Sequence, residues 1–192
     1  MVLVLAYVFW HRRRPEISRD AYEESLIGFQ KALKDSHLAG FVGSVVSRIG
    51  EAPWMNTNTE AYEDWYLLSG SEVMDRLNEV AVSGERKEPH DRAAHAATDG
   101  HGGLYQLRSG ENSVIDAPWA TWFSKPAGTA YERLYQEISE YFDPVNASLW
   151  RRQMVLAPSP EFCLRSHSKP SIPTSFAPIA VYHEILWRNV SR

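Results

Sequence analysis

The sequence predicts an α+β chain made of two ferredoxin-like units, and three observations support this prediction. Residues 7–23 (YVFWHRRRPEISRDAYE) and 119–132 (WATWFSKPAGTAYE) share one plan: an aromatic stretch, then Arg-Pro or Lys-Pro, then Ala-Tyr-Glu. Strand-like and helix-like segments follow the order β-α-β-β-α-β over residues 1–110. Much of that order recurs, in truncated form, over residues 111–192. We therefore expect two units, 1–110 and 111–192, in one compact structural domain.

The first unit opens with a strand and a helix joined by a short basic turn. Residues 2–10 are β-branched and aromatic with almost no polar side chain, which is typical of a strand buried on both faces. After Pro15, Ser18 suits the N-cap of a helix. Apolar residues then recur at helical spacing and form one stripe along this helix: Tyr22, Leu26, Phe29 and Leu33.

The remaining elements follow from periodicity and turn signals. In the first unit we expect strands over 40–49, 62–68 and 103–108, a helix from Ser71 to about residue 82, a short helix around 91–97, and a tight turn at 100–103. In the second unit we expect strands over 119–124, 147–156, 162–166 and 179–187, and a helix that starts at Tyr131 and stops before Pro144. The second unit has no second helix where one is expected, so it is truncated.

Residues 11–33 (HRRRPEISRDAYEESLIGFQKAL) resemble the dimeric α/β-barrel superfamily, in particular its EthD-like and antibiotic-biosynthesis-monooxygenase-like branches. The shared features are Arg13-Arg14-Pro15, a polar turn, and a helix that opens with an aromatic residue, Tyr22. In the second unit the same places are held by Lys125, Pro126 and Tyr131. Many EthD-like chains carry His-x-Pro near the end of the first helix, whereas this sequence has His37 without the proline.

The resemblance covers residues 2–35 and 118–142 by motif, and the rest only by the order of elements. It implies that the two units close one α/β barrel within the chain, as an internal tandem repeat. It also implies that a ligand binds either between the sheet and the helices or inside the barrel lumen.

Alternation along the strands gathers aromatic and histidine side chains on shared faces. In the first strand, one face carries Tyr7, Phe9 and His11, and the other carries Val8 and Trp10. In the third strand, one face carries Tyr62, Asp64 and Tyr66, and the other carries Glu63 and Trp65. In the last strand, Tyr182, Glu184 and Leu186 oppose His183 and Trp187.

These faces predict an aromatic pocket that holds a planar molecule by stacking and hydrogen bonding. The predicted ligand-binding residues are Tyr7, Phe9, Tyr62, Trp65, Tyr66, Trp122 and Tyr182. A histidine with an acidic neighbour across the sheet can act as a general base at neutral pH. The candidate bases are His11, His37 and His183.

Other polar groups give weaker signals. The arginines at 12–14 and 151–152 could receive a carboxylate, although solvated surface charge explains them more simply. We weighed a metal site among His90, Asp91, His95, Asp99 and His101, but a spacing of five does not place two histidines on one helix face, so no metal is predicted. The chain lacks P-loop, Rossmann, GxSxG and CxxC motifs, so no cofactor is predicted. Haem stays an open alternative, because some relatives in the superfamily bind it through one histidine, although no residue here matches a haem motif.

Composition narrows the class of function. Of the 192 residues, 44% are apolar, and the net charge of −4 comes from interspersed signs, which disfavours nucleic-acid binding. The single cysteine, Cys163, suits a reducing, cytoplasmic setting and a buried position. The apolar start is too short to span a bilayer and lacks the order of a signal peptide, so we expect no membrane partner.

Two hypotheses of function remain. The preferred one is binding of a small hydrophobic or aromatic molecule, with cofactor-independent oxygenation, decarboxylation or isomerisation as the implied reactions. The alternative is a non-enzymatic structural or regulatory barrel that acts through protein–protein assembly, with unpaired sheet edges and a homo-oligomeric state as its marks. In either case, His11 in the first unit stands where the second unit has an aromatic residue, so the site should be asymmetric.

Overall fold

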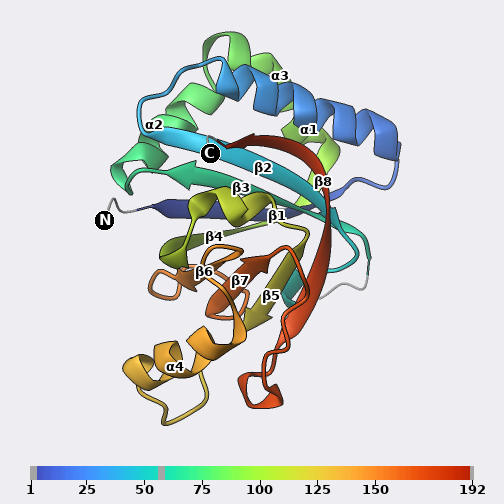
Figure 1. Cartoon of the computed structure of the whole chain (residues 1–192). Coiled ribbons are helices and arrows are strands. Elements are labelled where there is room, and N and C mark those ends of the chain that lie inside the picture. Colours follow the sequence, from blue (N-terminus) through green and yellow to red (C-terminus); the bar gives the residue numbers. More distant parts are fainter. Residues whose placement is uncertain (1–3, 56–58, 191–192) are drawn as a thin grey trace.

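A computed structural model describes residues 4–55 and 59–190 and shows an antiparallel β-barrel with helices on opposite sides (Figure 1). The strands are β1 (Leu5–Arg13), β2 (Phe41–Ile49), β3 (Ala61–Leu68), β4 (Ala97–Gly110), β5 (Trp119–Phe123), β6 (Ala147–Arg152), β7 (Phe162–Ser166) and β8 (Ile179–Val190). Three helices lie on one side and one on the other: α1 (Arg19–Lys34), α2 (Glu72–Ala81), α3 (Lys87–Ala96) and, opposite them, α4 (Tyr131–Ile138).

The ring closes in the order β1-β3-β2-β8-β5-β7-β6-β4, with antiparallel pairing throughout. The four strands of the first half lie side by side as β4-β1-β3-β2, and those of the second half as β8-β5-β7-β6. The two halves therefore have the same strand order, and the pairs β2–β8 and β4–β6 join them. Within the described residues, every strand therefore has a paired neighbour on each side, although β8 pairs with β5 only over 179–182 and with β2 only over 183–190.

Several predicted boundaries need correction. The first strand extends to Arg13, and the start of its predicted range lies partly outside the described residues. The predicted strand 147–156 ends at Arg152, and Met154 has a left-handed φ of 51° in the turn that follows. The missing helix of the second half falls between β7 and β8, where the described chain forms only a short 3-10 turn, Thr174–Phe176.

The glycine-rich segment 100–103 is part of β4, and the prediction of a tight turn there was wrong. These glycines make room for neighbouring aromatic rings on β1. A Cβ on Gly100 would lie 2.8 Å from the Phe9 ring, and one on Gly102 would lie 2.9 Å from the Tyr7 ring. Close approach of side chains, and not a change of chain direction, therefore explains the glycines.

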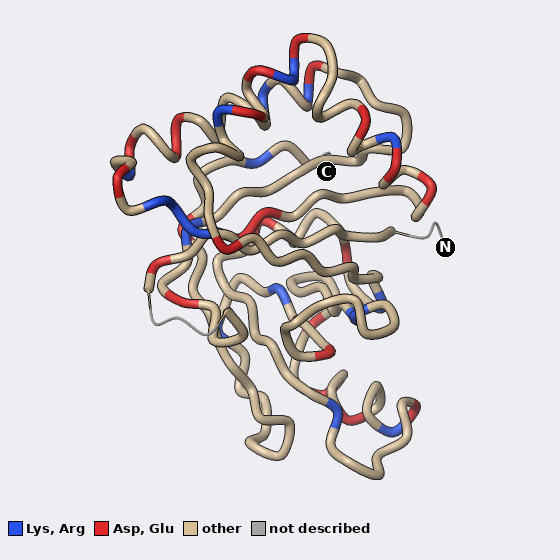
Figure 2. Tube along the Cα trace, turned by 180° about the vertical axis from the view of Figure 1, so that it is seen from behind, with Lys and Arg blue, Asp and Glu red and all other residues tan. Residues whose placement is uncertain are grey.

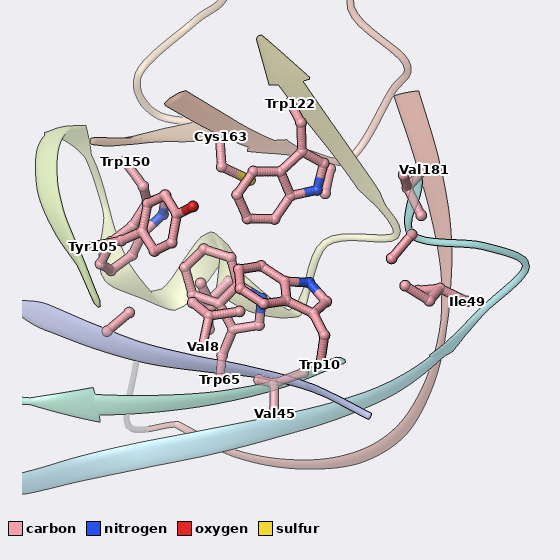
Figure 3. Packing of buried hydrophobic residues seen from close by; sticks show 14 of the residues in the cluster. Val8, Trp10, Val45, Ile49, Trp65, Tyr105, Trp122, Trp150, Cys163 and Val181 are labelled. Atoms are coloured by element: carbon pink, nitrogen blue, oxygen red, sulfur yellow. The ribbon is translucent and has the colours of Figure 1, made fainter. Parts of the chain in front are cut away.

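The barrel lumen is a packed aromatic core (Figure 3). Side chains from both halves point toward one another and are completely buried, among them Trp10, Trp65, Tyr105, Trp122, Trp150 and Cys163. The rings of Trp10 and Trp122 meet edge to face with centroids 5.5 Å apart, and Trp65 meets Trp150 at 5.3 Å. Such contacts are favourable for aromatic pairs, and they fill the lumen. A ligand must therefore bind elsewhere.

Two further apolar clusters lie outside the barrel. On the first half, the predicted stripe of α1 is buried as expected, and Ser18 caps this helix by accepting a hydrogen bond from the Ala21 amide. On the second half, α4 and the segment 167–178 pack on Phe123, Phe162 and their neighbours. Within the described residues, no helix is long and apolar enough to cross a membrane.

Candidate functional site

A cavity of about 380 Å³ lies between the outer face of the first-half sheet and the three helices that cover it. This volume is within the usual range for small-molecule sites. The sheet side is aromatic and polar, whereas the helix side is mostly apolar, with Asn78 of α2 and His90 of α3 as its polar members. The lining residues include Tyr7, Phe9, His11, Tyr22, Asp64 and Tyr66 near the sheet, and Leu26, Phe29, Met74, Leu77, Ala93 and Ala94 from the helices.

Strand alternation builds the sheet side as the sequence predicts. Tyr7, Phe9 and His11 project outward from β1, while Val8 and Trp10 project into the lumen. The three outward rings stack in a row, with centroids 6.3 Å apart for Tyr7 and Phe9 and 5.0 Å apart for Phe9 and His11. This row of near-parallel rings lines the sheet side of the cavity.

Small residues on α3 create the space opposite this surface. Ala93 and Ala94 line the cavity, as does Ala97 just beyond the helix. Longer side chains at these positions would occupy the volume. The cavity therefore depends on a pairing of large rings on the sheet with methyl groups on the helix.

The polar end of the cavity is a chain of three side chains. His11 Nδ1 lies 2.5 Å from the Tyr22 hydroxyl, and His11 Nε2 lies 3.2 Å from Asp64 Oδ1. Burial and the nearby charge of Asp64 raise the pKa of Tyr22, so its hydroxyl keeps its proton and donates to Nδ1. Nε2–H then donates to the Asp64 carboxylate, which fixes the imidazole as the neutral tautomer with an accepting Nδ1.

Asp64 is also the end point of a second, longer chain of hydrogen bonds. The Tyr66 hydroxyl donates to Asp64 Oδ2 over 2.9 Å, and the Gln30 amide donates to the Tyr66 oxygen over 2.9 Å. Ser44 donates to Gln30, and Trp187 donates to Ser44. Burial and Asp64 also raise the pKa of Tyr66, which keeps its hydroxyl a donor. These donors hold the carboxylate, and through it His11, in one orientation.

The structure gathers only some of the predicted site residues. His11, Tyr7, Phe9 and Tyr66 line the cavity, and Tyr62 stacks on the face of His11 at 5.7 Å between centroids. Trp65 and Trp122 lie in the packed lumen. Tyr182 is 58% exposed on β8, stacked edge to face on Trp119.

The other two candidate histidines lie away from the cavity. His37 is exposed in the turn after α1, with a left-handed φ of 49°. His183 is buried in the lumen beside Glu63. The expectation that His183 and Trp187 share a face was wrong, because a β-bulge intervenes: Ser47 pairs with Ile185, whereas Val46 pairs with Trp187. Trp187 therefore projects outward toward Ser44.

Sequence reasoning did not assign roles to Asp64, Tyr22 and Gln30, which complete the polar end. A signal existed for Asp64, since alternation places it on the same face as Tyr62 and Tyr66, across the sheet from His11. Tyr22 and Gln30 gave no such signal, because Tyr22 fits an apolar helical stripe and Gln30 resembles any polar helix residue.

A second buried polar cluster lies inside the lumen, centred on Glu63. Its carboxylate accepts hydrogen bonds from Trp10 Nε1 (2.8 Å), Trp65 Nε1 (2.6 Å) and His183 Nε2 (2.8 Å), and Arg165 Nη1 lies 3.4 Å away. Arg165 also donates to the Ala117 carbonyl. Burial alone would raise the pKa of Glu63, but the His183 and Arg165 partners outweigh it and lower this pKa to about 2.

We expect this cluster to make the protein sensitive to acid. A carboxyl with a lowered folded-state pKa stabilises the fold above its ordinary value near 4.5, and the contribution disappears as the pH falls through about 2. The loss should be about 3 kcal/mol for Glu63 alone. Urea unfolding at about pH 5 and about pH 2.5, compared between the native chain and Glu63→Gln, measures it. Equal pH dependence of the two proteins would contradict the assignment.

The second half has no counterpart of the polar cavity end. In the strand register, Trp10 pairs with Glu63 in the first half and Trp122 pairs with Cys163 in the second half, so these two pairs occupy equivalent positions. The next residue along each strand is then also equivalent. Phe123 therefore corresponds to His11, and Leu164 corresponds to Asp64. Phe123 stacks on Phe162 at 5.2 Å in an apolar cluster. The site is asymmetric, as the sequence indicates. Among the described residues, no three His, Cys, Asp or Glu side chains assemble into a group that could hold a metal.

An eight-stranded antiparallel ring with helices outside it, and a cavity between the sheet and the helices, defines a mixed α+β fold built on a closed barrel. No family model and no curated protein matches the chain. Among solved structures, a candidate chlorite dismutase superposes with a TM-score of 0.58 at 12% identity, covering 96% of this chain and 95% of that one. A candidate monooxygenase from Lactobacillus acidophilus NCFM gives 0.52 at 9% identity, covering 97% and 96%. At these identities the likeness shows the fold alone.

Proposed function

We propose that the chain binds a small hydrophobic, aromatic molecule in the cavity between the first-half sheet and α1–α3, and that His11 acts there as a general base. The observation that carries the proposal is the buried His11 imidazole at the cavity end, held between Asp64 and Tyr22. The row of near-parallel aromatic rings beside it suits an aromatic ligand.

The geometry supports one direction of proton transfer. Tyr22 donates its proton to His11 Nδ1 and accepts one from an acidic O–H or C–H group of the ligand. His11 then carries both protons, and Asp64, which accepts from Nε2–H, stabilises the imidazolium. The ligand is left as an enolate or phenolate-type anion. Such an anion is the first intermediate of cofactor-independent oxygenation or of isomerisation, and the name of the monooxygenase neighbour agrees with the first of these.

We also propose that the barrel is an internal tandem repeat of one ferredoxin-like unit related to EthD-like and antibiotic-biosynthesis-monooxygenase-like chains. The identical strand order of the two halves and the equivalent register of Trp10 and Trp122 support this proposal. The competing idea, a non-enzymatic barrel that acts by assembly, was expected to show unpaired sheet edges. The described strands form a closed ring, so that support is lacking.

Filling the cavity tests the proposed function. Ala93→Phe places a ring in the cavity and is expected to abolish ligand-induced thermal shifts from a panel of aromatic compounds, while the apo protein still unfolds cooperatively. His95→Phe adds the same ring on the exposed face of α3 and serves as the matched control, with shifts unchanged. If no aromatic compound shifts the melting temperature of the native chain, or if Ala93→Phe leaves the shifts intact, the proposal fails.

A further inference from the structure

We infer that the cavity selects its ligand by charge: it takes an uncharged aromatic compound that donates a hydrogen bond, a hydroxyarene, and rejects aromatic carboxylates, with Asp64 as the specificity-determining residue. This inference rests on the proposed function, because it concerns the ligand of the same cavity. It also disfavours the sequence-based alternative in which paired arginines receive a carboxylate.

The charges around the cavity are the first argument. Within the described chain, the lining residues include no lysine or arginine, and Asp64 is the lining carboxylate, 2% exposed. Figure 2 shows the charged residues of both signs spread mainly over the outer helices and loops. An anionic ligand would lie beside this buried carboxylate with no lysine or arginine in the lining to offset the charge, which is strongly unfavourable at low dielectric.

The arginines considered above as carboxylate ligands have partners elsewhere. Arg12 pairs with Asp99, and Arg13 and Arg14 donate to the backbone carbonyls of Ile17 and Ala97. Arg151 pairs with Glu161. The remaining arginine of the second pair, Arg152, donates to the carbonyls of Ala157 and Ser159. None of the five is among the residues that line the cavity.

The hydrogen-bonding capacity left at the polar end is the second argument. Each N–H and O–H of the chain described above is already directed at a neighbour: Tyr22 at His11, His11 at Asp64, and Tyr66 at Asp64. A carboxylate offers about four lone-pair positions, of which these donors use two. The oxygens of Asp64 and Tyr22 can therefore accept further hydrogen bonds, so the complementary ligand group is a donor such as a phenolic O–H.

The rest of the cavity limits the body of that ligand. The stacked row of Tyr7, Phe9 and His11 favours a flat ring system, and the alanines opposite leave a slot for it. A hydroxyl on such a ring, pointed toward Asp64 and Tyr22, donates a hydrogen bond at the polar end of the cavity while the ring occupies the apolar slot. The same hydroxyl is the acidic group that the His11 base requires.

Three probes with the same ring system test the inference: 2-naphthol, 2-methoxynaphthalene and 2-naphthoate, titrated calorimetrically into the full chain at neutral pH. We expect 2-naphthol to bind most tightly. The methoxy compound should bind about tenfold more weakly because it lacks the hydrogen-bond donor. Naphthoate should bind on the order of 100-fold more weakly because the Asp64 carboxylate repels its charge. Asp64→Asn should bring the affinities for naphthol and naphthoate within about threefold of each other. Glu88→Gln removes an exposed carboxylate on α3 that pairs with Arg92, and we expect it to leave the order unchanged.

The outcomes separate the two proposals. Binding of naphthoate to the native chain as tightly as naphthol, or an Asp64→Asn variant that folds by circular dichroism and keeps the native preference, overturns the charge rule while leaving a ligand cavity in place. If none of the three probes binds, the proposed function fails and the charge rule fails with it.

Discussion

Replacement of Glu63 by glutamine is expected to lower the free energy of unfolding by about 3–5 kcal/mol, the usual cost of removing one partner from a buried ion pair. Glu63 and Arg165 are completely buried in the lumen. The Glu63 carboxylate also accepts hydrogen bonds from the indole N–H groups of Trp10 and Trp65. Glutamine keeps the shape but leaves the guanidinium without a counter-charge in an aromatic core. Urea unfolding followed by tryptophan fluorescence and circular dichroism measures the loss.

Two controls identify the cause. The double variant Glu63→Gln/Arg165→Met removes both charges and should recover most of the lost free energy, because a buried ion pair is often matched by neutral side chains of similar volume. Glu88→Gln removes a surface carboxylate that pairs with Arg92 and should leave stability unchanged within error. A double variant as unstable as Glu63→Gln alone would show that lost shape, and not an unpaired charge, is responsible.

Local patterns in the sequence carry much of the fold. The alternation over residues 7–11 predicts that His11 and Trp10 lie on opposite faces, which the structure confirms, and the structure adds that His11 is outside and Trp10 is in the lumen. The apolar stripe of α1, whose residues are separated by four, three and four positions, is buried as predicted. These predictions hold because the periodicity of a strand or helix depends only on neighbouring residues.

Other features could not be predicted because they depend on residues far apart in the chain. Aromatic side chains on an inward face look alike whether they fill a lumen or line a pocket, so Trp65 and Trp122 were assigned to the ligand. Glu63 meets Arg165 and His183 across 102 and 120 residues, and no local pattern signals that contact. The bulge in β8 depends on pairing with β2, which forms only when the ring closes. Long-range packing, rather than local propensity, decides all three.

Converting the polar end of the cavity into its apolar counterpart is the second large effect we expect. The double variant His11→Phe/Asp64→Leu gives the first half the pair that the second half carries as Phe123 and Leu164. Asp64→Leu alone leaves the buried donors of His11 and Tyr66 without an acceptor, and His11→Phe alone leaves a buried carboxylate short of a donor. Each single change should cost about 2–4 kcal/mol of unfolding free energy.

The double variant should lose at least about 2 kcal/mol less than the sum of the two singles, because it removes the donor and the acceptor of one hydrogen bond together. Its affinity for 2-naphthol should nevertheless fall at least about tenfold, since the acceptor for the ligand hydroxyl is gone. Unfolding and calorimetric titration of the four proteins supply both numbers. Additive stability losses would deny the coupling of His11 and Asp64, and unchanged naphthol binding would deny their role toward the ligand. Both expectations follow from one physical asymmetry: the second half stabilises its face with apolar packing, whereas the first half keeps a buried polar group that stability alone does not require.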